Sequence, residues 1–100
     1  MSSTRAEMEA TTALVVAALV RFDQRPSEDD IAALTGQLLQ HGALLVAEVA
    51  DVPGSAAALA DWELLTTSGA ENSPLGTWTY ARGLARTVRR MTELLNAAAQ

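Results

Sequence analysis

Residues 25–49 read RPSEDDIAALTGQLLQHGALLVAEV, and this stretch predicts one long α-helix with a defined start and a buried face. The residue before Pro26 disfavours helical backbone, so a preceding helix must end there. Ser27 is placed to cap the next helix, and the acids at 28–30 oppose the positive end of its dipole. The apolar residues recur at helical spacing and predict one buried stripe: Ile31, Leu34, Leu38, Leu45 and Val49. Gly42 falls on this stripe, where we expect another helix to approach closely.

Similar signals on both sides of this helix, which we expect to end near Asp51, predict three more. They are a first helix over residues 4–23, a third over 55–67, and a fourth that Ser73 caps and Pro74 opens. No segment alternates between apolar and polar residues in the way a strand does. The short connections favour antiparallel neighbours. We therefore expect an all-α fold, with residues 1–100 forming a single domain, a four-helix up-down-up-down bundle.

The first predicted helix is apolar around more than half of its circumference. Its inner face is predicted to consist of Met8, Val15, Leu19 and Phe22, and further apolar residues widen that face. A helix of this kind contacts more than one neighbour. We therefore expect a homodimer whose interface includes Leu14, Val16 and Val20.

The fourth predicted helix has an apolar stripe on one side and an arginine arc on the other. The stripe is Leu84, Val88, Met91 and Leu95, and the arc is Arg82, Arg86, Arg89 and Arg90. Residues 74–100 hold four arginines against one acid, a net charge of +3, whereas residues 1–73 have a net charge of −8. The pattern predicts a solvated face, and it leaves open a docking surface or a small-anion site. Trp78, one turn before Arg82, is placed for a cation–π contact with it.

Nucleic acid is not an expected partner of this chain. The sequence has a pI near 4.6 and no lysine, whereas DNA affinity rests mainly on several phosphate contacts. Residues 28–36 resemble the start of a helix-turn-helix. The segment that follows is apolar and acidic, where a recognition helix needs polar and basic groups.

The residue inventory also disfavours metal sites and known catalytic motifs. There is no cysteine, and His41 is the only histidine, with Gln37, Leu38, Leu44 and Leu45 at the positions where a second ligand would stand. We expect His41 to bond to a neighbouring helix, although acid–base use with Glu48 stays open. No phosphate loop or nucleophile elbow is present, so the sequence indicates neither catalysis nor a cofactor.

The apolar stretch at 13–20 is too short for a bilayer, and no targeting segment is evident, so we expect a cytoplasmic protein.

Residues 25–49 and 80–95 resemble a family of short actinobacterial proteins of uncharacterised function, often encoded near natural-product biosynthesis clusters. The shared pattern is an Arg-Pro-acidic entry, an IxxLTxxLxxH run and a final AR-x-LAR-x-V helix. The matching positions are Leu34, Leu38, His41, Ala81, Arg82, Leu84, Ala85, Arg86 and Val88. The resemblance implies an actinobacterial setting and gives His41, Arg82 and Arg86 added interest.

Three functions are compatible with these patterns. The first is a non-enzymatic accessory protein of bacterial specialised metabolism that binds a partner or a copy of itself. The second is a small-molecule binder or small enzyme with a pocket between helices near Trp78, Tyr80 and His41, able to hold a small anion. The third, which the charge disfavours, is a DNA-binding regulator.

Overall fold

The computed structural model describes residues 5–99, which form four α-helices and one short 3₁₀ helix. The α-helices are α1 (Arg5–Ala18), α2 (Glu28–Val49), α3 (Ala56–Ser68) and α4 (Pro74–Ala98), and the 3₁₀ helix is η1 (Phe22–Gln24). Residues 5–99 contain no strand, which confirms the all-α class and the four helices. Thr4, where we expect the first helix to begin, lies outside the described residues. No helix among residues 5–99 is long and apolar enough to cross a bilayer.

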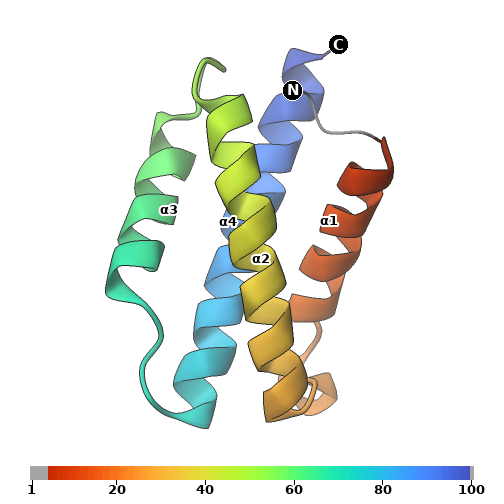
Figure 1. Cartoon of the computed structure of the whole chain (residues 1–100), viewed down its shortest axis with the longest axis vertical. Helices are drawn as coiled ribbons and strands as arrows, with labels where there is room; N and C mark the ends of the chain where they lie inside the picture. The colour runs from red at the N-terminus through yellow and green to blue at the C-terminus, as the bar shows by residue number, and fades with distance from the viewer. Residues whose placement is uncertain (1–4, 100) are drawn as a thin grey trace.

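Helix α4 is the element that the other three helices share. It packs against α1, α2 and α3, while α1 also packs against α2. In Figure 1, α2 lies in front of α4, and α1 and α3 lie on opposite sides of this pair. The start of α1 and the end of α4 lie at the same end of the molecule (Figure 1). The Cα radius of gyration is 13.2 Å, close to the ~13 Å of a compact domain of this length.

Most of the core is made by the stripes that α2 and α4 turn toward each other, and α1 and α3 add Val15, Ala18, Ala58 and Trp62. All five residues of the predicted α2 stripe are buried, as are Leu84, Val88 and Met91 of α4, while Leu95 is half-buried. The α4 face is wider than the predicted stripe, because Trp78, Ala81 and Ala85 are also buried. The small alanines let neighbouring helices come close to the α4 backbone.

Two serine caps fix the starts of α2 and α4. The Ser27 hydroxyl accepts a hydrogen bond from the backbone N–H of Asp30 at 3.2 Å, and the Ser73 hydroxyl accepts one from Gly76 at 2.9 Å. Both caps confirm the predictions made from the sequence. Each satisfies a backbone donor that the first turn of a helix leaves without a partner.

The end of the first helix is where the prediction is wrong. The helix α1 stops at Ala18 instead of continuing to Asp23, and the chain then turns into η1. Phe22 is 56% exposed, with the Arg25 guanidinium carbon 3.9 Å from its ring centroid, so it does not belong to the inner face. The physical reason is a tertiary contact. Val20 packs against the buried cluster around Trp78, and the backbone leaves the helical path so that Val20 reaches that cluster.

Gly42 of α2 is in contact with the Trp62 side chain of α3. The indole ring of Trp62 lies over the glycine, and a β-carbon built at this position would overlap the ring. Trp62 is itself buried as part of the core. A close contact is therefore present at Gly42, but it is made by the ring of a tryptophan on α3 and not by close packing of a second helix, since α2 and α3 are not among the closely packed helix pairs.

Substituting Gly42 by alanine should destabilise the protein by about 1–3 kcal/mol, because the new methyl group must displace the Trp62 ring. Gly36→Ala is the matched control on the same helix, since nothing lies within 4 Å of a β-carbon there. That control should stabilise by about 0.5–1 kcal/mol through helix propensity alone. Urea unfolding of both variants measures the difference, and equal shifts in the same direction would contradict the packing at Gly42.

Candidate functional site

The outer face of α4 is basic and is not covered by another helix. Arg86, Arg89 and Arg90 are exposed there, and a depression of about 370 Å³ is lined by Asp61, Arg86, Thr87, Arg89, Arg90 and Glu93. The Arg89 Nε lies 3.8 Å from the Glu93 carboxylate, whereas Arg86 and Arg90 form no ion pair within residues 5–99. These two arginines contribute little to the fold, so they are available to bind a negatively charged group.

Arg82 does not share this position, which corrects the expectation that all four arginines face solvent. Its Nη1 donates to the Val20 carbonyl at 2.6 Å and to the Ala18 carbonyl at 3.3 Å. These carbonyls stand at and just after the end of α1, where backbone acceptors have no partner in the helix. A cation also suits the negative end of the α1 dipole. Arg82 is therefore a structural clamp between α1 and α4.

A groove between α1 and α4 adjoins the arginine depression. It has a volume of about 460 Å³ and is lined by Thr12, Val15, Val16, Leu19, Arg89, Thr92, Glu93 and Asn96. Arg89 and Glu93 line both depressions, so the two form one continuous surface. We call this the α1–α4 surface.

Of the three predicted interface residues, Val16 is the one that lies on this surface. It is 63% exposed and lines the groove. Leu14 is half-buried against the main core, and Val20 is half-buried against Trp78. The wide apolar arc of the first helix is therefore largely used within the chain.

Trp78 is a core residue and does not face a ligand cavity. It is 3% exposed and packs with Ile31 and Ala81. The Arg82 guanidinium carbon lies 5.4 Å from the Trp78 ring centroid, which confirms the expected cation–π contact. Trp78 thus supports the clamp that Arg82 makes.

His41 bonds to a neighbouring helix, as expected. Its Nδ1 lies 2.7 Å from the Thr11 hydroxyl oxygen, and that oxygen lies 2.9 Å from the Glu7 carbonyl oxygen. The Thr11 hydroxyl has one hydrogen, so it donates either to the Glu7 carbonyl, with His41 Nδ1–H as donor to Thr11, or to an unprotonated Nδ1. Within residues 5–99, no three histidine or carboxylate side chains lie close enough together to hold a metal ion.

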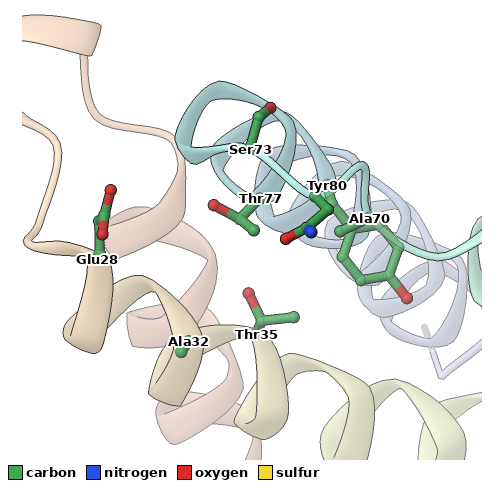
Figure 2. A pocket seen from close by; sticks show the side chains of 8 residues that line it. Glu28, Ala32, Thr35, Ala70, Ser73, Thr77 and Tyr80 are labelled. Atoms are coloured by element: carbon green, nitrogen blue, oxygen red, sulfur yellow. The ribbon is translucent and has the colours of Figure 1, made fainter.

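The structure does not bring Trp78, Tyr80 and His41 together. Trp78 packs against Ile31, and Ile31 and His41 are ten residues apart on α2, about 15 Å along the helix. Tyr80 instead lines a cavity of about 470 Å³ at the starts of α2 and α4, shown in Figure 2. The cavity is lined by Glu28, Ala32, Thr35, Ala70, Asn72, Ser73, Thr77 and Tyr80, which include neither Trp78 nor His41.

The residues that line this cavity together with Tyr80 were not predicted from the sequence. A signal was present, because Glu28, Ala32 and Thr35 follow the spacing i, i+4, i+7, and so do Ser73, Thr77 and Tyr80. Each row lies along one side of a helix. Only the packing of α2 against α4 makes the two rows face each other.

Within residues 5–99, the structure thus defines a small all-helical protein with a continuous apolar and basic surface, the α1–α4 surface, and a separate cavity beside Tyr80. The chain belongs to a family of unknown function, DUF6415, whose family model matches residues 6–100. Neither the curated proteins nor the solved structures contain a match to this chain.

Replacing Arg82 by glutamine should lower the free energy of unfolding by about 1–2 kcal/mol, because two carbonyls at the end of α1 lose a charged donor. Arg90→Gln, two helical turns further along α4, is the matched control, because Arg90 is exposed and forms no ion pair within residues 5–99, and it should change stability by less than about 0.5 kcal/mol. Chemical unfolding followed by circular dichroism compares them. Equal stability of the two variants would show that the Arg82 clamp is not structural.

Stability should fall as the pH rises past about 10, because burial raises the pKa of the Tyr80 hydroxyl above its ordinary value. The unfolded chain then releases the proton at a lower pH than the folded chain, so alkali favours unfolding. The chain has one tyrosine, no lysine and no cysteine, which makes this titration unusually easy to isolate. Tyr80→Phe should flatten the profile of unfolding free energy between about pH 9 and 11, and an unchanged slope would contradict the assignment.

Proposed function

We propose that the chain is a non-enzymatic interaction protein that acts by helix-mediated self-association. In this proposal each copy is an up-down-up-down bundle, and α1 of one copy lies in the α1–α4 groove of the other. The observation that carries the proposal is the α1–α4 surface, where the exposed Val16 lines a groove, and Arg86 and Arg90, which form no ion pair within residues 5–99, line the depression beside it.

The apolar part of the surface fits a second α1. Val15, Val16 and Leu19 line the groove, and Val16 also projects from the exposed side of its own helix. In a two-fold symmetric interface the same patch of each copy must supply both the projecting residue, here Val16, and the groove that receives it. Exposed Leu44 and Leu64 are not among the residues that line this groove.

The charges on the two helices are also complementary. Glu9 lies seven residues before Val16, two turns away on the same exposed side of α1, so a docked α1 brings a carboxylate to Arg86 and Arg89. Glu9 is paired at 3.4 Å with Arg5, and both side chains are well exposed, so this weak pair is easily exchanged for another. Packing α4 against a second α4 would instead oppose arginine to arginine.

The proposal places this role in bacterial specialised metabolism, as an accessory protein of the cytoplasm. Support for that setting is the resemblance carried by residues 25–49 and 80–95. Membership of a family of unknown function adds no activity to this proposal.

Molar mass by light scattering tests the self-association directly. Wild type should be a dimer at micromolar concentration, and Val16→Asp should weaken the dimer by at least about ten-fold, because a carboxylate would be buried without a partner. Ala17→Asp is the matched control, since Ala17 is exposed on the same helix and does not line the groove. A wild-type monomer up to high micromolar concentration would contradict the proposal.

The same measurement separates the apolar contact from the charged one. Arg86→Gln with Arg89→Gln should weaken the dimer by about five-fold and remove most of its salt dependence. Glu9→Gln should do the same, because it removes the opposite partner. If Val16→Asp weakens the dimer and none of the charge substitutions does, the apolar contact in the groove is supported and the proposed ion pairs are contradicted.

A further inference from the structure

The cavity beside Tyr80 has the build of a ligand site, and it lies apart from the α1–α4 surface. Its volume of about 470 Å³ falls within the ~300–1,000 Å³ of small-molecule sites. Two helices and the connecting segment supply its walls: Glu28, Ala32 and Thr35 from α2, Ala70 and Asn72 from the segment before α4, and Thr77 and Tyr80 from α4. Figure 2 shows Glu28 and the Tyr80 ring on opposite sides of the space.

Among the residues that the structure describes, the only charged group that lines the cavity is the Glu28 carboxylate. Glu28 also lines a second depression with Arg25, which contributes one positive charge beside the half-charge of the α2 N-terminus. Asp29 and Asp30 follow Glu28 on α2, and Glu71 stands beside Asn72, so the negative charges outnumber the positive ones. None of the arginines lines this cavity. The local field therefore favours a cation and disfavours the small anion considered for the arginines.

The hydrogen-bonding groups on the α2 wall of the cavity indicate the same type of ligand. The Thr35 hydroxyl donates its hydrogen to the Ile31 carbonyl at 2.8 Å, so it presents only lone pairs to the cavity. An ionised carboxylate is also an acceptor and not a donor. Glu28 and Thr35 thus offer acceptors from the α2 wall, which suits a ligand that brings its own N–H donors.

The remaining wall suits an apolar or aromatic body. The half-buried Tyr80 ring offers a flat π-face, and Ala32 and Ala70 are small enough to leave room beside it. We propose that this cavity binds a small organic amine, with its ammonium group at Glu28 and its apolar body against Tyr80. The proposal concerns a ligand site and does not depend on the dimer.

Tyramine is a suitable probe, because it joins a protonated amine to an aromatic ring. Amide NMR titration of the full chain should show saturable shifts at residues 28–35 and 70–80, with a millimolar dissociation constant typical of so small a ligand. 3-(4-Hydroxyphenyl)propionate has a similar ring and chain with the opposite charge. It should bind at least about ten-fold more weakly, since attraction to Glu28 becomes repulsion.

Two variants distinguish a site from general charge attraction. Glu28→Gln should weaken tyramine binding by about five-fold. Asp29→Asn removes the same charge one residue away but does not touch the cavity, so it should leave binding nearly unchanged. Equal losses in both variants, equal binding of the carboxylate analogue, or the absence of saturable shifts in these residues at about 10 mM tyramine would each overturn the proposal.

Discussion

The packing of α4 against three other helices is the constraint on which the rest of the structure depends. Its buried residues are Trp78, Ala81, Leu84, Ala85, Thr87, Val88 and Met91, a face wide enough to serve α1, α2 and α3 together. A chain of this length has a thin core, so its few large apolar side chains bury the most surface when one central helix packs against the other three. Because no other helix covers the remaining side of α4, that side is left for charged residues.

This arrangement explains why the four arginines of α4 have different roles. Arg82 lies where α4 meets the end of α1, and its guanidinium satisfies carbonyls there while stacking over Trp78. Arg86 and Arg90 are further around the helix and serve no such purpose. The position of each arginine relative to α1 separates the stabilising Arg82 from the exposed Arg86 and Arg90. That division is the basis for the proposal that the α1–α4 surface mediates self-association.

The parts of the fold that local signals determine were predictable from the sequence. The helix α2 has a serine cap, an acidic first turn and a stripe of large apolar residues, and each of these was found as expected. A close contact at Gly42 was predictable for the same reason, because Gly42 interrupts a stripe of large residues. The identity of the His41 partner, Thr11, needed the structure, although the bonding of His41 to a neighbouring helix followed from its position at the stripe's edge.

The features that were not predictable depend on contacts between distant segments. The helical spacing of apolar residues continues through Phe22, yet the first helix ends at Ala18. The chain bends there because Val20 packs against the cluster around Trp78 and Arg82 donates to the Val20 carbonyl. A helical wheel places Arg82 with the other arginines and contains no information about the end of α1. The cavity at Tyr80 likewise arises only where α2 and α4 lie together. Leu14 and Val20, predicted for an interface, are half-buried for the same reason.

The central claim, that α4 organises the fold, is tested most directly by native-state hydrogen exchange. If α4 holds the core together, the amides of Leu84–Met91 should be among the slowest to exchange, with a free energy equal to that of global unfolding. The amides of α3, which packs mainly on α4, should exchange through smaller openings. Slowest exchange in α1 or α3, with α4 opening at a lower free energy, would contradict the account.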